Sequence, residues 1–84
     1  MQKPVKIFTL STCSHCRATK ELLNEYNVAY DYVDVDLLDI PEKRRVLEEV
    51  AQFNPRRTFP TIIIDGAIII VGYREDEIKE ALGL

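Results

Sequence analysis

Two apolar runs joined by Asp65-Gly66 constrain the fold of this chain more than any other feature of its sequence. The runs are Thr61–Ile64 and Ala67–Val71. Asp-Gly between apolar runs is the strongest short-range signal of a β-hairpin, because both turn residues must take positive φ. These residues therefore predict two antiparallel strands close to the C-terminal end of the sequence.

The first half of the sequence predicts a strand, a helix and a second strand. Residues 4–9 indicate a short strand that opens with proline. Residues 14–27 indicate a helix with one apolar face, made of Thr19, Leu22, Leu23 and Tyr26. From residue 28 apolar and polar residues alternate, and the change of phase at Val33 predicts a strand end or a bulge.

Two further helices are marked by their first turns. Asp39, Pro41 and Glu42 combine a capping residue, a first-turn proline and a glutamate three places after the cap. That helix should bury Val46, Leu47, Val50 and Ala51, and should end before Asn54-Pro55. Acidic residues 75–77 suit the first turn of a last helix, which carries Ile78, Ala81 and Leu82.

The predicted order is therefore β-α-β-α-β-β-α, within one domain that spans residues 1–84. A helical crossover between the first two strands makes that pair parallel, whereas the last two strands are antiparallel. We expect an α/β fold in which helices flank a small mixed sheet.

Composition narrows the class of partner. The formal net charge of −3 argues against a nucleic-acid-binding face, and no apolar run approaches the roughly 18 residues of a membrane helix. The first residues lack the apolar stretch of a secretory signal, so we expect a cytoplasmic protein. A monomer is the default expectation for a small α/β fold of this kind. Thiols are normally kept reduced in that compartment.

The pair Cys13 and Cys16, with Ser14 and His15 between them, follows the first strand and opens the first helix. Free N–H groups and the positive end of the helix dipole favour a thiolate there, and the pKa in such motifs falls from about 8.5 to between ~3.5 and ~7.5. The thiolate is the form that attacks a disulfide. We predict that Cys13 is the nucleophile and Cys16 the resolving thiol. Arg17 and Lys20 add positive charge nearby, and His15 also stabilises the thiolate when it is protonated.

Three other uses of the cysteines are open. A disulfide across two intervening residues would constrain little chain entropy. A structural zinc site normally needs four ligands, and His15 is the sole histidine. Two ordinary buried cysteines are the third alternative. Redox chemistry is favoured over all three.

At this point the sequence resembles the glutaredoxin family over nearly its whole length. The resemblance is carried by the strand before the cysteines, the Cys13-Ser-His-Cys16 motif, the segment Thr58-Phe59-Pro60, the following hairpin and Gly72. It implies a thioredoxin-like fold with a four-stranded mixed sheet and a cis Phe59–Pro60 peptide bond. It also implies that Pro60 lies beside the sulfurs and that the backbone of Phe59 pairs with an extended substrate.

The resemblance further implies which residues bind the substrate: Arg57, Thr58, Phe59, Pro60, Tyr73 and Arg74. It leaves the reductant open between glutathione and thioredoxin reductase. Arg57, with its neighbour Arg56, stands where glutathione-using members place basic residues, and glutathione is a candidate co-substrate; no permanently bound cofactor is expected. In contrast, Leu10 and Tyr73 replace a usual lysine and glycine of the glutathione site. The segment with Tyr73 and Arg74 is closer to NrdH-type redoxins, which are reduced by thioredoxin reductase.

The function expected from these residues is thiol–disulfide exchange with a protein or small-molecule disulfide, as an enzyme or electron carrier. One alternative is an iron–sulfur cluster carrier in which two chains share a cluster through Cys13 and glutathione. Another is a disulfide oxidase or isomerase, because His15 occupies the position seen in Cys-x-His-Cys sites of such proteins.

Overall fold

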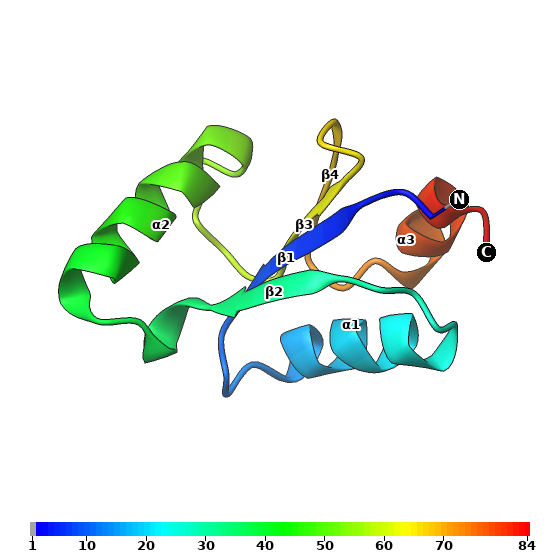
Figure 1. Cartoon of the computed structure of the whole chain (residues 1–84), viewed down its shortest axis with the longest axis horizontal. Helices are drawn as coiled ribbons and strands as arrows, with labels where there is room; N and C mark the ends of the chain where they lie inside the picture. The colour runs from blue at the N-terminus through cyan, green and yellow to red at the C-terminus, as the bar shows by residue number, and fades with distance from the viewer. Residues whose placement is uncertain (1) are drawn as a thin grey trace.

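A four-stranded mixed sheet forms the centre of the computed structural model, which describes residues 2–84 (Figure 1). The strands are β1 (Val5–Thr9), β2 (Asp31–Asp34), β3 (Thr61–Ile64) and β4 (Ile68–Val71), in the order β2-β1-β3-β4. As predicted, β1 and β2 are parallel and β3 and β4 are antiparallel; β1 also pairs antiparallel with β3.

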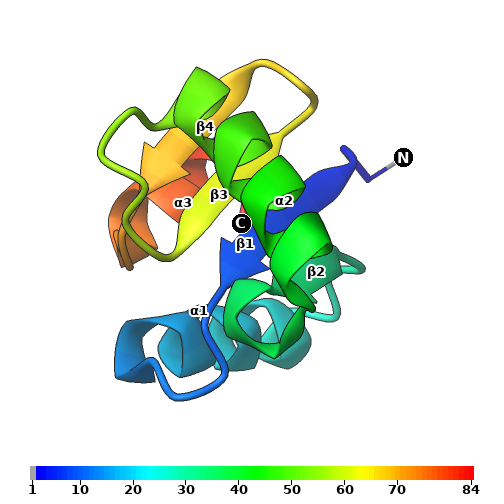
Figure 2. The same ribbon diagram turned by 90° about the vertical axis from the view of Figure 1, so that its left-hand side faces the viewer.

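Helices cover both faces of the sheet. They are α1 (Ser14–Glu25), α2 (Ile40–Phe53) and α3 (Glu75–Leu82), with a 3-10 turn η1 (Val35–Leu37) between β2 and α2. Helix α2 lies across one face, while α1 and α3 lie on the other (Figure 2). The observed element order confirms the predicted one, and η1 is an addition to it.

Each face of the sheet has its own apolar core because side chains alternate along the strands. Val5 and Ile7 of β1 pack with residues of α1 and α3, whereas Phe8 packs with Val46 and Val50 of α2. None of the described helices is long and apolar enough to cross a membrane.

Short stretches of sequence account for the hairpin turn between β3 and β4 and for the two ends of α2. Asp65 and Gly66 both have positive φ, 57° and 68°, as the hairpin requires. Asp39 caps α2 by accepting a hydrogen bond from the N–H of Glu42 at 3.0 Å. Helix α2 ends at Phe53, just before Asn54-Pro55.

The second strand differs most from its prediction. It begins at Asp31 and ends at Asp34, so the expected strand end is confirmed, but Val28 and Tyr30 precede it. Tyr32 is 53% exposed and Tyr26, expected on the buried face of α1, is 40% exposed. Both tyrosines lie at the margin of the fold, where β2 is an edge strand and α1 has just ended.

Candidate functional site

Cys13 caps the N-terminus of α1. Its backbone is extended, with φ −88° and ψ 121°, and its Sγ accepts a hydrogen bond from the backbone N–H of Cys16 at 3.2 Å. That N–H belongs to the first turn, which has no backbone acceptor within the helix. The half-buried sulfur therefore meets both a hydrogen-bond donor and the positive end of the helix dipole.

The loop before Cys13 is held at both of its ends. The N–H of Cys13 donates to the carbonyl of Leu10 at 3.2 Å, which closes a turn. Ser11 donates to Asp36 of η1 through its backbone N–H at 2.8 Å and also through its hydroxyl. These hydrogen bonds hold the pKa of Asp36 below its usual value, so the carboxylate that anchors the loop stays charged at neutral pH.

Cys16 lies one turn into α1 and is 1% exposed. Burial raises the pKa of its thiol from 9.0 to about 12, and a hydrogen bond with Cys13 acts in the same direction. A hydrogen bond from Leu10 and the positive charge of Lys20 partly oppose this rise. Both cysteines are free thiols, and Cys16 keeps its proton at neutral pH.

A polar group lies on the same side of the sheet as α1. Lys20, four residues after Cys16, places its Nζ 3.2 Å from Oδ1 of Asp34. The hydroxyl of Thr9 lies 2.5 Å from that oxygen and 3.1 Å from the carbonyl oxygen of Val33. The ammonium also stands 4.1 Å from the centroid of the Tyr32 ring.

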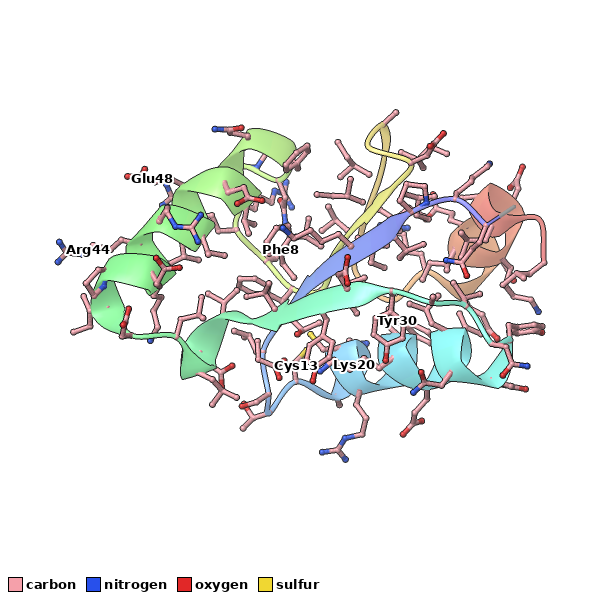
Figure 3. The ribbon with its side chains drawn as sticks, in the orientation of Figure 1. Phe8, Cys13, Lys20, Tyr30, Arg44 and Glu48 are labelled. Carbon is pink, nitrogen blue, oxygen red and sulfur yellow. The ribbon has the colours of Figure 1, made fainter. Side chains whose placement is uncertain are left out.

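Sequence reasoning did not bring this group together. It treated Lys20 as a nearby positive charge and Asp34 as one position of an alternating strand. The available signal was the spacing of four between Cys16 and Lys20, which puts both on one side of a helix. Figure 3 shows Cys13 at the start of α1 and Lys20 farther along the helix, with Phe8 in the separate layer toward α2.

The peptide bond between Phe59 and Pro60 is cis, as the resemblance implied. Pro60 is fully buried, and its carbonyl accepts a hydrogen bond from the N–H of Gly72 at 2.8 Å. Phe59 is half-buried and packs against the core under α2. The cis bond is thus fixed beside the segment that follows β4.

Asn54 organises the loop that leads to this proline. The side chain is 4% exposed, and its Nδ2 lies 3.1 Å from the carbonyl oxygen of Thr58 and 3.1 Å from the hydroxyl of Thr61. Its Oδ1 accepts from the N–H of Arg56 at 3.2 Å. From the sequence Asn54 was expected only to follow the end of the second helix; its position between a helix end and a proline was the available signal.

Four of the predicted site residues line one open pocket of 340 Å³. They are His15, Phe59, Tyr73 and Arg74, joined there by Val71 and Gly72. The lining of this pocket includes neither of the two cysteines nor Pro60. It also does not include Arg17, Arg57 or Thr58, whose side chains are exposed. The pocket thus joins the first turn of α1 to the segment after β4.

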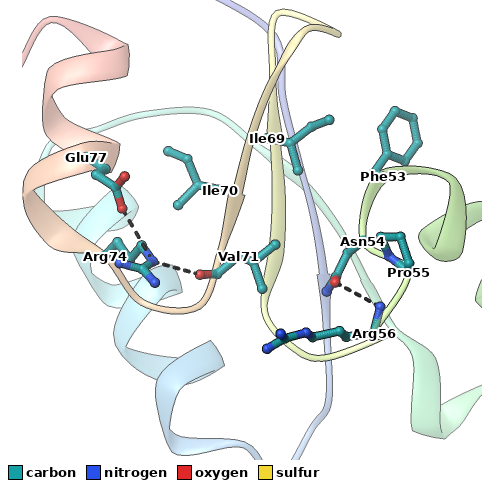
Figure 4. A pocket seen from close by; sticks show the side chains of 9 residues that line it. All are labelled: Phe53, Asn54, Pro55, Arg56, Ile69, Ile70, Val71, Arg74 and Glu77. Carbon is teal, nitrogen blue, oxygen red and sulfur yellow. Dashed lines mark hydrogen bonds and ion pairs between the residues drawn. The ribbon is translucent and has the colours of Figure 1, made fainter.

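A larger hollow of 710 Å³ lies between the end of α2 and β4, and Arg74 borders it as well (Figure 4). Arg74 Nε donates to the carbonyl of Val71 at 3.2 Å and lies 3.4 Å from a carboxylate oxygen of Glu77. Arg56 borders this hollow from the opposite side. Arg74 therefore lines both of these hollows.

Comparisons with known proteins agree with this geometry. The glutaredoxin family model matches residues 5–69. An uncharacterised glutaredoxin-like 8.6 kDa protein from the rubredoxin operon of Clostridium pasteurianum is 37% identical over 78 residues, which are 93% of this chain and 96% of that protein.

Solved structures give the same result. Methanoredoxin of Methanosarcina acetivorans superposes with a TM-score of 0.92 at 43% identity, over 96% of this chain and 85% of that one. The glutaredoxin of Methanosarcina mazei Go1 superposes with a TM-score of 0.87 at 47% identity, over 96% of this chain and 79% of that one. With a matching family model, a related sequence and a shared thioredoxin-like fold, this chain belongs to the glutaredoxin family of thiol–disulfide oxidoreductases.

Proposed function

We propose that Cys13 is the attacking thiolate of a dithiol redoxin. The observation that carries this proposal is the hydrogen bond of 3.2 Å from the N–H of Cys16 to Cys13 Sγ at the start of α1. A negatively charged sulfur gains from that donor and from the helix dipole. Cys13 is also the less buried of the two cysteines, so a substrate disulfide can reach it.

Cys16 completes the reaction. Cys13 Sγ attacks one sulfur of the substrate disulfide, and the other substrate sulfur leaves as a thiolate that takes up a proton. Cys16 then loses its proton and attacks Cys13 Sγ, which releases the second substrate thiol and leaves an intramolecular disulfide. The substrate is reduced by two electrons, and the two cysteines are oxidised by two.

The substrate chain is proposed to lie along Phe59. An extended segment would pair with the Phe59 backbone beside Pro60, with its side chains in the pocket of His15, Tyr73 and Arg74. An open pocket of 340 Å³ suits a peptide-like disulfide. Arg57 and Thr58, exposed on the adjoining loop, supply further contacts at its edge.

His15 and Arg17 are proposed to set the reduction potential. Both are exposed on the first turn of α1, beside Cys13. Positive charge there stabilises the thiolate, and therefore the reduced protein, so we expect a potential less negative than about −270 mV, the thioredoxin value. Equilibration with a glutathione redox buffer measures it, and a value at or below that figure contradicts the role given to these two side chains.

We favour thioredoxin reductase as the source of electrons, with glutathione as the second candidate. Tyr73 occupies a position where glutathione users have glycine, and Leu10 one where they have lysine. Arg56 and Arg57 favour glutathione, because guanidinium groups bind carboxylates. Turnover with NADPH and thioredoxin reductase, compared with glutathione and glutathione reductase, distinguishes the two.

The assignment of the two thiols is tested by reduction of a small-molecule disulfide. Cys13→Ser should lose activity, whereas Cys16→Ser should still form a mixed disulfide that mass spectrometry detects at Cys13. Thr12→Ala, at an exposed position of the same loop, serves as a control for loss of a hydroxyl. Full disulfide reductase activity in Cys13→Ser would falsify the assignment.

A further inference from the structure

The resolving step poses a problem that the cysteine pair alone does not solve. Cys16 must become a thiolate to attack Cys13. Its side chain is only 1% exposed, and this burial favours the protonated form of the thiol. Once Cys13 is bound to substrate it carries no negative charge and cannot act as a base. A base in the protein that receives the proton from Cys16 would therefore speed this step.

The structure places a charged pair in that layer. Thr9 follows Val5 and Ile7 on the face of β1 that packs against α1, and Asp34 is the residue paired with Thr9 in the parallel β1–β2 register. Lys20 comes from α1 itself, one turn beyond Cys16, and its charge already acts on the Cys16 thiol. The two side chains of the pair are only 24% and 16% exposed.

The geometry points to Lys20 and Asp34 as the groups that assist deprotonation of Cys16 in the resolving step. Asp34 accepts the proton through the polar layer beneath α1, and Lys20 stabilises the thiolate that results. This inference rests on the proposed function. It adds to that function a base and a cation that neither the cysteine motif nor the pocket lining contains.

Thr9 fits both states of such a carboxylate. A hydroxyl has one proton to donate, and two acceptors surround it here: the Val33 carbonyl at 3.1 Å and Asp34 Oδ1 at 2.5 Å. When Asp34 is ionised, Thr9 donates to it. When Asp34 is protonated, its O–H donates to the Thr9 oxygen and Thr9 donates to Val33. Thr9 therefore keeps a hydrogen bond to Asp34 in both protonation states.

The proposed step balances. The S–H bond of Cys16 breaks and its proton passes to Asp34. The Cys16 sulfur forms a bond to Cys13 Sγ as the bond between Cys13 and the substrate sulfur breaks, and the electron pair leaves with the substrate thiolate. Asp34 then returns its proton to the leaving thiolate or to solvent.

Other charged groups near Cys16 are placed differently. Cys13, the cap of α1, is consumed in the mixed disulfide. Strand β1 contributes the uncharged Thr9, and strand β2 contributes Asp34 and the exposed Tyr32. The neighbouring ionisable side chains are exposed to solvent or committed to other partners: His15, Arg17 and the Ser11-bound Asp36.

The two steps can be timed separately with dithiobis(nitrobenzoate). Attack by Cys13 releases the first thionitrobenzoate, and attack by Cys16 on the mixed disulfide releases the second. In the wild-type protein the second phase should vary little with pH between about 6 and 9, because the carboxylate paired with Lys20 takes the proton in place of hydroxide. Asp34→Asn should slow this phase at least about tenfold at neutral pH and make it rise about tenfold per pH unit, since hydroxide must replace the base.

Lys20 and a matched control complete the experiment. Lys20→Met should slow the second phase about tenfold, while Lys20→Arg and Asp34→Glu should restore most of it. Lys6→Met is the control, because Lys6 has the same kinds of partner on the exterior: Glu49 at 3.5 Å and the Phe8 ring at 5.1 Å. The first phase should be unchanged in all variants.

The possible results separate the two proposals. A second phase in Asp34→Asn with the wild-type rate and pH profile overturns the role of the ion pair. Absence of a first phase at Cys13 overturns the proposed function instead. If Asp34→Asn does not fold, the comparison of Lys20→Met with Lys20→Arg decides, and equal second phases in these two variants refute the inference.

Discussion

Replacement of Asn54 by alanine should destabilise the protein and weaken substrate binding together. The two hydrogens of Nδ2 serve three acceptors, at 3.1 Å, 3.0 Å and 3.1 Å, on Thr58 and Thr61, and Oδ1 accepts from Arg56. Each such hydrogen bond contributes about 1 kcal/mol net. Thr61 retains its own bond to Thr58 at 2.8 Å, so the loss is partial.

We therefore expect Asn54→Ala to lower the free energy of unfolding by about 2–3 kcal/mol. For a domain of this size that corresponds to a fall in Tm of roughly 10–20 °C. Urea and thermal denaturation of the reduced protein measure both quantities. The control is Asn24→Ala, on the exposed side of α1, which should change stability by less than about 0.5 kcal/mol.

The same variant tests whether this network positions the Phe59–Pro60 segment. With Thr58 released, the loop before Phe59 loses its anchor, and the KM for a disulfide substrate should rise more than kcat falls. If the free energy of unfolding of Asn54→Ala lies within about 0.5 kcal/mol of the wild-type value, the stabilisation assigned to the Asn54 hydrogen bonds is refuted. An unchanged KM in a destabilised variant would refute the positioning role alone.

Three further outcomes follow from groups described above. In the reduced protein Cys16 holds its proton up to a pKa of about 12, whereas in the unfolded chain a thiol ionises near 9.0. The free energy of unfolding should therefore fall between about pH 9 and pH 12, by at most about 1.4 kcal/mol per pH unit. Urea denaturation of Cys16→Ala over the same pH range should lack the part of this fall that Cys16 causes. Native protein treated with iodoacetamide at neutral pH should be alkylated at Cys13 before Cys16. Equal labelling of the two cysteines, measured by mass spectrometry of the peptides, would contradict this. Asp39→Ala should cost about 0.5–2 kcal/mol in urea unfolding through loss of the α2 cap, and an unchanged midpoint would speak against that contribution.

Local chemistry made much of the fold predictable. The Asp65-Gly66 turn and the Asp39 cap depend on residues within four positions of one another, so the sequence specifies them without knowledge of the rest of the chain. The bounds of β2 were harder to predict. An edge strand buries few side chains, and the alternation that began at Val28 therefore did not mark where hydrogen bonding to β1 starts.

The candidate site divides in the same way. Cys13 and Cys16 could be found because they lie within one helical turn, and Pro60 because its surrounding segment resembles that of a known family. The association of Lys20 with Asp34 and Thr9 could not be found locally, since it depends on the pairing of two strands 25 residues apart. Amphipathic patterns indicate which face of a strand is buried, but they do not specify which residue of the neighbouring strand lies opposite.

The parallel pairing of Thr9 with Asp34 has a consequence for how this protein can change. A slip of β2 by one residue along β1 would reverse the direction of every side chain in the strand. The aspartate would then face α2, and Lys20 would lose its counter-ion although both residues were still in the sequence. An insertion or deletion of a single residue between α1 and β2 should thus impair release of the reduced product while leaving the first encounter with a disulfide intact.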